Sequence, residues 1–173
     1  NNIRTALQGQ QGDRRLRLGI AGGEWKKMMA DATARTRFAS EVKKIIEQYD
    51  FDGVDFDFEW PTNTNEFNNY SATVIQMRST LGKYVYFTAS LHPVSFKISP
   101  EAIDALDFIS YQCYGPAVMR FPYEQFVKDG EMAITYGIPK NKLVMGVPFY
   151  GSTGSLIAAY YDCLLYTSPS PRD

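Results

Sequence analysis

The chain contains the run Phe51-Asp-Gly-Val-Asp-Phe-Asp-Phe-Glu-Trp-Pro61, in which acidic and apolar side chains alternate. Successive side chains of a β-strand point to opposite faces, so Asp55, Asp57 and Glu59 share one face and the apolar residues between them share the other. An apolar face of this kind fits a strand that helices cover in a parallel sheet. The run therefore predicts a buried strand over residues 53–59 with three acids on its open face.

The three acids are expected to share one small space, because the rise of about 3.3 Å per residue puts neighbouring same-face acids roughly 6–7 Å apart. Crowding of like charges raises the pKa of at least one of them, and a general acid needs such a retained proton near neutral pH. We expect Asp57 and Glu59 to be the pair that shares the proton.

Two other interpretations of the acids are a solvated strand edge and a site for a divalent cation. The spacing differs from that of an EF-hand loop, and Trp60-Pro61 follows where further oxygen ligands would be needed. A solvated edge does not explain the large apolar side chains on the opposite face. We therefore favour a catalytic role and expect no metal.

The rest of the chain alternates short runs rich in β-branched and aromatic residues with stretches of helical period. The expected strands cover residues 15–21, 53–59, 84–91, 108–113 and 142–148. Helices are expected at 38–49, at 67–81 with Gly82 as a cap, from Ser99 onward, and at 123–136 despite Gly130. This alternation predicts an α/β fold with a parallel sheet, and it suits an open doubly wound sheet or part of a closed barrel.

Composition argues against several classes of partner. The chain has 173 residues, with 18 Lys and Arg against 19 Asp and Glu, so it offers no basic surface for nucleic acid or anionic lipid. No apolar run approaches the roughly 20 residues of a membrane span. Cys113 and Cys163 match no metal-ligand spacing, and the glycines of residues 18–25 lack the dinucleotide-binding pattern. We expect no cofactor, no nucleic acid and no membrane.

Residues 52–59 resemble the D-G-x-D-x-D-x-E motif on the fourth barrel strand of family 18 glycoside hydrolases, which are chitinase-like (β/α)8 barrels. Residues 107–114 and 142–151 are similar to the sixth and seventh strands of that family. The resemblance covers roughly residues 16–151 and implies an incomplete (β/α)8 TIM barrel that carries strands three to seven. It implies a partial catalytic domain over residues 1–162 and a non-native or disordered tail over 163–173.

The same resemblance implies hydrolysis of β-1,4-linked N-acetylglucosamine polymers, with retention of configuration and with the N-acetyl group of the substrate as nucleophile. Glu59 would protonate the glycosidic oxygen, Asp57 would orient the acetamide, Asp55 would support Asp57, and Tyr114 would hydrogen-bond the acetamide. The further substrate-binding candidates are Gln112, Trp60, Tyr150 and Trp25. The chain departs from the family pattern at Gly115, where many members have an aspartate.

Two other functions remain open from the sequence. One is a chitinase-like lectin that binds chito-oligosaccharides without cleaving them, against which the intact Glu59 argues. The other is an endo-β-N-acetylglucosaminidase that acts on N-glycans. The family further implies a secreted or extracellular protein that is monomeric when full length. His92, the sole histidine, follows a predicted strand without a Ser or Cys elbow and is expected to be a loop residue.

Overall fold

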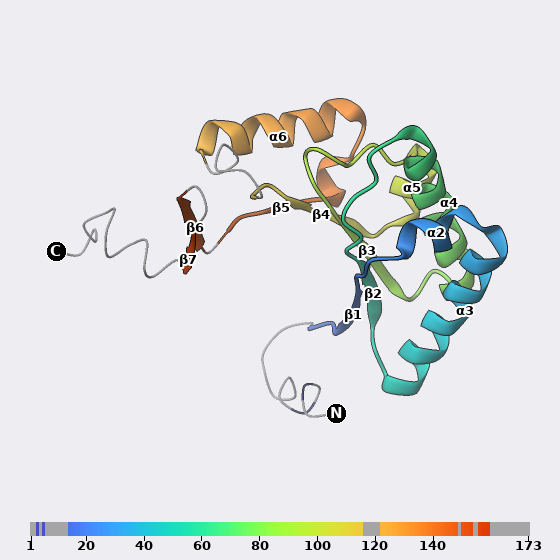
Figure 1. The fold of residues 1–173 in the computed structure, drawn as a ribbon. Coiled ribbons are helices and arrows are strands. Elements are labelled where there is room, and N and C mark those ends of the chain that lie inside the picture. The colour runs from blue at the N-terminus through green and yellow to red at the C-terminus, as the bar shows by residue number, and fades with distance from the viewer. Residues whose placement is uncertain are drawn as a thin grey trace.

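The computed structural model describes residues 14–115, 122–148, 150–153 and 156–159, together with residues 3 and 5. Its main feature is a parallel sheet of five strands in the order β1-β2-β3-β4-β5 (Figure 1). The strands are β1 Arg17–Ile20, β2 Gly53–Phe56, β3 Tyr86–Leu91, β4 Phe108–Gln112 and β5 Leu143–Gly146. The predicted parallel α/β arrangement is confirmed, with every strand paired to its neighbour in sequence.

The observed strands are shorter than the predicted ones, most notably β2. Its ladder with β1 ends at the pair Ile20 and Phe56, although the backbone N–H of Asp57 still donates to the carbonyl oxygen of Ile20 at 2.9 Å. The predicted strand over residues 53–59 is therefore three residues too long. The pattern of alternation continues past the ladder, because Phe58 is still buried.

Helices connect the strands and cover one face of the sheet (Figure 1). The α-helices are α2 Trp25–Ala30, α3 Ala32–Tyr49, α4 Thr64–Leu81, α5 Pro100–Ala105 and α6 Tyr123–Tyr136, and a short 3-10 helix, η2, spans Lys140–Lys142. Asp31, Asn63 and Ser99 cap the N-termini of α3, α4 and α5 by accepting a backbone N–H. The sequence did not predict α2, a six-residue helix too short to show a period.

Helix α6 continues through Gly130, a residue type that disfavours the interior of a helix. The glycine is buried, and a Cβ atom at this position would lie 3.1 Å from the Cε atom of Met145 in β5. The missing side chain thus lets α6 approach β5 closely, and this packing offsets the conformational cost of glycine in a helix. Tyr136 at the end of α6 donates its hydroxyl to the carbonyl oxygen of Ile98 at 2.8 Å.

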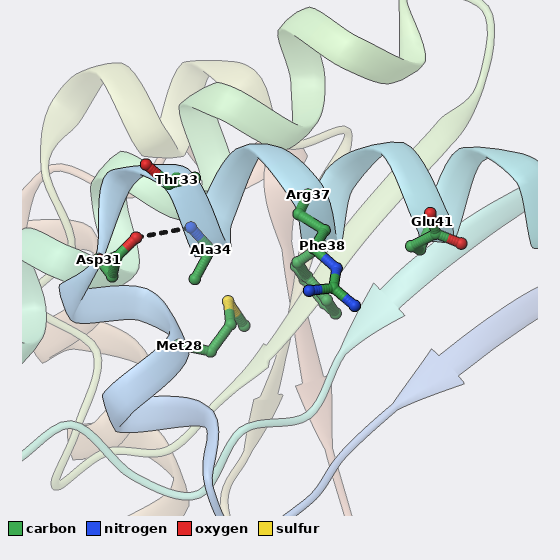
Figure 2. A pocket seen from close by; sticks show the side chains of 7 residues that line it. All are labelled: Met28, Asp31, Thr33, Ala34, Arg37, Phe38 and Glu41. Carbon is green, nitrogen blue, oxygen red and sulfur yellow. Dashed lines mark hydrogen bonds between the residues drawn. The ribbon is translucent and has the colours of Figure 1, made fainter.

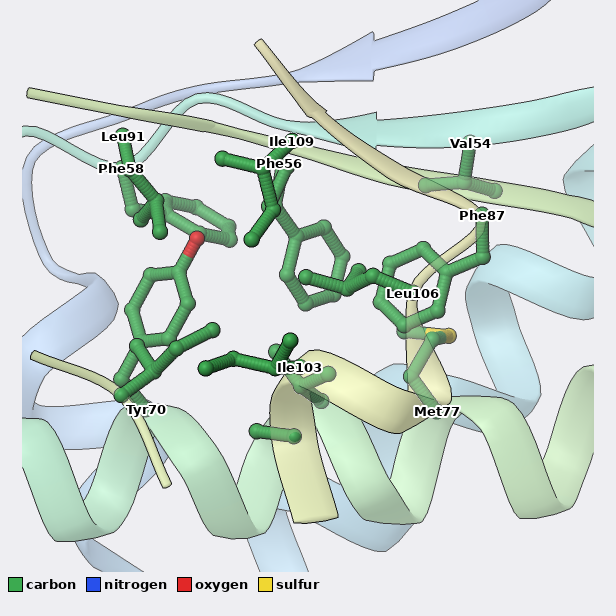
Figure 3. Close-up of a cluster of buried hydrophobic side chains, with 14 of the residues drawn as sticks. Val54, Phe56, Phe58, Tyr70, Met77, Phe87, Leu91, Ile103, Leu106 and Ile109 are labelled. Carbon is green, nitrogen blue, oxygen red and sulfur yellow. The ribbon is translucent and has the colours of Figure 1, made fainter. Parts of the chain in front are cut away.

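The core lies between the sheet and the helices, and Figure 3 shows the part of it that α4 and α5 cover. Phe56 is at its centre, with its ring centroid 4.8 Å from that of Phe87 and 5.1 Å from that of Phe58. Val54 and Phe56 are fully buried and Phe58 is 3% exposed. The prediction that these three residues face the helices is confirmed, which places the alternate, acidic positions on the opposite side.

Two further strands, β6 Tyr150–Thr153 and β7 Leu156–Ala159, form an antiparallel pair. The side chains of these strands and all of residues 163–173 lie outside the described part of the chain, so the predicted tail stays a prediction. Among the described residues, no helix is both long and apolar enough to cross a bilayer.

Candidate active site

The candidate site lies at the carboxyl ends of β2, β3 and β4. Asp55 is in β2, Asp57 follows directly after it, and Gln112 is the last residue of β4. Parallel strands present their carboxyl ends at the same edge of the sheet, which is where the active sites of α/β barrels are built. The predicted acids are therefore held at the edge that barrel enzymes use.

Asp55 is surrounded by hydrogen-bond donors from the two neighbouring strands. Arg17 of β1 forms an ion pair with it, with Nη1 3.2 Å from Oδ1. Thr88 of β3 donates its hydroxyl to the same oxygen, and Ser90 donates to Oδ2 at 3.0 Å. The register explains the contact, because Asp55 is paired with Gly19 on one side and with Thr88 on the other. Asp55 is therefore held in one orientation by three donors.

Asp57 differs from Asp55 in its surroundings. Its partner is the amide of Gln112, whose Nε2 donates to Oδ1 at 3.2 Å. Burial raises the pKa of the Asp57 carboxyl above its ordinary value, and the charge of Asp55 raises it further, while the hydrogen bond from Gln112 acts in the opposite direction. The sequence led us to expect that Glu59 would be the partner in this effect. The structure instead identifies Asp55 as the acid whose charge acts on Asp57.

Glu59 lies beyond the end of β2 and its side chain is exposed. Within the described residues its carboxylate makes no hydrogen bond and no ion pair. The backbone on either side is held more firmly, because Phe58 is buried in the core and the carbonyl oxygen of Pro61 accepts the hydroxyl of Ser95 at 2.6 Å. The position of the Glu59 carboxyl therefore depends on how its backbone is anchored.

Tyr114 follows β4, two residues after Gln112, and its side chain is half-buried. Its ring lies against the backbone of Gly146 at the end of β5, since a Cβ atom there would be 3.2 Å from Cε1 of the tyrosine. The structure thus brings four of the predicted site residues to the carboxyl edge of the sheet: Asp55, Asp57, Gln112 and Tyr114. Glu59 lies just beyond the same edge and is exposed.

The remaining predicted sugar contacts are placed differently. Trp25 is 5% exposed and packs in the core, with its ring centroid 5.8 Å from that of Phe58 and 6.3 Å from that of Tyr70. Because Phe58 faces the helices, this position is on the side of the sheet away from the acids, and Trp25 is not included in the site that we propose below. Trp60 is half-buried beside Glu59. The side chain of Tyr150 lies outside the described residues.

Sequence reasoning missed Arg17, Thr88 and Ser90, which orient Asp55. A signal for them was present, because each is a polar residue inside a predicted strand that is otherwise mostly apolar. Thr88 and Ser90 are two residues apart and must share a face. In a sheet whose other face is covered by helices, such polar positions point to the same side as the acids.

A surface hollow lies at the junction of α2 and α3 (Figure 2). It is lined by Met28, Asp31, Thr33, Ala34, Arg37, Phe38 and Glu41. All of these belong to the helical layer, and none of the predicted site residues lines the hollow. The hollow is therefore separate from the candidate site at the strand ends. Within the described residues, no group of three or more His, Cys, Asp or Glu side chains is arranged to hold a metal ion.

Comparison with known families agrees with this geometry. The model of glycosyl hydrolases family 18 matches residues 4–161. The chain belongs to this family. Among curated relatives, the family 18 chain is 27% identical to "Probable chitinase 2" of Drosophila melanogaster, over 83% of the chain and 36% of that protein. It is 28% identical to the endochitinase of Manduca sexta, over 80% of the chain and 32% of that protein. The chain thus spans about a third of the length of these relatives.

Solved structures of family 18 share the fold. The chitinase ChiB from the chitin utilization locus of Flavobacterium johnsoniae superposes with a TM-score of 0.78 at 21% identity, covering 95% of this chain and 60% of that one. A class V chitinase of Nicotiana tobaccum, solved in complex with NAG4, gives a TM-score of 0.71 at 22% identity, covering 86% and 52%. The expected fold class is confirmed: the five parallel strands and their helices are part of a (β/α)8 barrel.

Proposed function

We propose that the full-length protein hydrolyses β-1,4-linked N-acetylglucosamine polymers, chitin or chito-oligosaccharides, with Glu59 as general acid and base. The observation that carries the proposal is the set of three acids at the carboxyl end of β2, of which Asp57 has a raised pKa. Relatives that bear the name chitinase and a neighbour solved with NAG4 support the choice of substrate.

The proposed mechanism assigns a separate task to each acid. Glu59, exposed at the mouth of the site, donates its proton to the glycosidic oxygen and later takes one from water. The substrate's own acetamide oxygen attacks the anomeric carbon, so configuration is retained without a nucleophile from the protein. Asp57 accepts the acetamide N–H and stabilises the positive charge that develops on the ring formed by this attack.

The surrounding residues fix Asp57 for this task. Asp55 is held by Arg17, Thr88 and Ser90 and acts on Asp57 through its charge. The Tyr114 hydroxyl hydrogen-bonds the acetamide from the other side, and Gln112 contacts both Asp57 and the sugar. Trp60 and Tyr150 complete the proposed sugar contacts. The protein acts as a monomer on an extracellular substrate, as the family resemblance implies.

The decisive test replaces Glu59 with Gln in the full-length protein. Loss of the proton donor should lower kcat on a fluorogenic chito-oligosaccharide by about 10²–10⁴-fold, the usual contribution of a general acid. Glu47→Gln is the matched control, because Glu47 is exposed near the end of α3, which leads into the amino end of β2, whereas the acids lie at its carboxyl end. Unchanged turnover in Glu59→Gln would eliminate the assignment.

Two further readouts separate the proposal from its alternatives. A first product in the β-anomeric form, observed by NMR before mutarotation, is expected for retention. Tight binding of the oligosaccharide by the wild-type protein without any cleavage would identify a lectin instead. Cleavage of N-glycans in preference to chito-oligosaccharides would identify an endo-β-N-acetylglucosaminidase.

A further inference from the structure

His92 lies in the loop just past the end of β3, as the sequence predicted, and it is buried, with 1% of its surface exposed. Its Nε2 atom is 2.9 Å from the carbonyl oxygen of Tyr114 and 2.7 Å from that of Gly115. Its Nδ1 atom accepts the backbone N–H of Val94 at 3.2 Å. Two acceptors face one ring nitrogen and a donor faces the other. This arrangement is satisfied by the neutral tautomer with the proton on Nε2.

The other side of the imidazole contacts the segment that carries Glu59. The ring centroid of His92 lies 4.8 Å from that of Trp60, with the two planes inclined by 37°. The same turn holds the next residue, because Ser95 donates its hydroxyl to the carbonyl oxygen of Pro61 at 2.6 Å. The turn is closed by the backbone N–H of Ser95, which donates to the carbonyl oxygen of His92 at 2.7 Å. Residues 92–95 therefore contact both residues that follow Glu59.

We propose that His92 is a positioning residue, whose single imidazole joins the Glu59-Trp60 segment to the Tyr114-Gly115 turn and so sets the separation of the general acid from the acetamide-binding tyrosine. The inference rests on the function proposed above. Glu59 has no hydrogen bond among the described residues, so its carboxyl follows the backbone that Trp60 and Pro61 fix.

The turn that carries Tyr114 and Gly115 is also held by His92. Gly115 has a φ of 34°, a left-handed conformation that glycine adopts readily, and the turn exposes two successive carbonyl oxygens to one donor. The buried imidazole N–H that the two carbonyl oxygens share holds the turn in place, and its loss would remove this link to both of them. His92 is thus tied to Tyr114 by hydrogen bonds and to the Glu59 segment by ring packing.

The two contacts of His92 can be removed separately in the full-length protein. His92→Gln keeps an amide donor near the place of Nε2 and removes the ring that packs on Trp60. His92→Phe keeps a ring and removes the donor to Tyr114 and Gly115. Because a misplacement of about 1 Å can cost 10²-fold, we expect kcat to fall by about 10- to 100-fold in His92→Phe and less in His92→Gln. KM should change less than kcat in both, because only the proposed Tyr114 and Trp60 contacts to the sugar are disturbed and the others stay in place.

A double-mutant cycle shows whether the effect passes through Tyr114. Tyr114→Phe removes the hydroxyl that the proposal places on the acetamide, so the loss caused by His92→Phe should become clearly smaller in that background. Ile103→Val is the control for stability alone, because Ile103 is a buried core residue of α5 that belongs to neither loop. Full additivity of the two losses, or a fall in kcat that only follows the folded fraction as in the control, would overturn the proposal.

A spectroscopic measurement keeps the inference separate from the proposed function. The ¹⁵N shifts of the imidazole should report a neutral ring with the proton on Nε2 and with Nδ1 as an acceptor. A proton on Nδ1 at the pH of the assay would refute the arrangement, even with an active enzyme. If the wild-type protein cleaves no chito-oligosaccharide but shows this tautomer, the proposed function fails and the structural link is kept. Oligosaccharide affinity then replaces kcat as the quantity that the variants must lower.

Discussion

Gly146→Ala tests whether the position of the Tyr114 ring matters, without removing any functional group. An added Cβ atom would lie 3.1 Å from the carbonyl oxygen of Tyr111 and 3.2 Å from Cε1 of Tyr114, both closer than the ordinary contact range that begins at 3.4 Å. The oxygen belongs to strand β4, which is paired with β5 and cannot easily retreat. The tyrosine ring must therefore move by a few tenths of an ångström.

The expected effect on catalysis follows from the size of this displacement. If a misplacement of 1 Å costs about 10²-fold, a shift of a few tenths of an ångström should lower kcat/KM by about 3- to 10-fold. The fold should survive, because the overlap costs about 1–3 kcal/mol and the loss of chain entropy in the unfolded state returns about 0.4–1 kcal/mol. The assay is cleavage of a fluorogenic chito-oligosaccharide by the full-length protein, together with its unfolding midpoint in urea.

The control for Gly146→Ala is Gly19→Ala, at the position that pairs with Asp55 in the neighbouring strand. A Cβ atom there meets no described atom within 4 Å, so this variant should keep its kcat/KM. In the Tyr114→Phe background the effect of Gly146→Ala should largely disappear. A folded Gly146→Ala variant with wild-type kcat/KM would refute the reasoning, because the ring would then have moved without consequence.

Two further predictions concern stability. Gly53→Ala should cost about 3 kcal/mol or more in the free energy of unfolding, because its Cβ atom would lie 2.0 Å from the backbone oxygen of Tyr86 and only movement of the strands could relieve the overlap; a urea midpoint close to that of the wild type would contradict this. Asp57→Asn should stabilise the fold at pH 7. The pKa of Asp57 is raised in the folded protein, so its contribution to stability is complete below the unfolded pKa of 3.8. This contribution is lost as the pH rises through the folded pKa. The advantage of Asp57→Asn should therefore vanish below pH 3.8, and an equal advantage at pH 3 and pH 7, measured by urea unfolding, would show that burial of the charge is not its cause.

Alternation within single strands was the most reliable sequence signal. It correctly placed Val54, Phe56 and Phe58 in the core and the acidic positions on the opposite face. This prediction depends on backbone geometry alone, and it holds for Phe58 even though the ladder has ended two residues earlier. The end of β2 could not be predicted from its own residues, because it is set by where the neighbouring strand β1 stops.

The sequence could not predict the burial of residues whose place depends on distant segments. Trp25 was a candidate sugar contact by resemblance to the family, whereas a helix of six residues begins with it and its side chain is buried in the core. His92 lies in a loop, as expected, but its burial was not predicted, because it results from the segments that carry Trp60 and Tyr114 converging on it. Their positions relative to one another follow from the packing of three separate strands, which no local pattern contains.

The two acids Glu59 and Asp55 are held in position in different ways, and only one of these ways depends on the packing of the core. Phe58, the residue before Glu59, is buried in the core. Trp60 and Pro61, the two residues after it, contact the turn of residues 92–95. Asp55, in contrast, is oriented by Arg17, Thr88 and Ser90 within the sheet itself. Glu59, the proposed proton donor, is therefore placed by its backbone, whereas Asp55, whose charge acts on Asp57, is placed by its side chain. Substitutions in the core beneath Phe58 should consequently disturb Glu59 before they disturb Asp55.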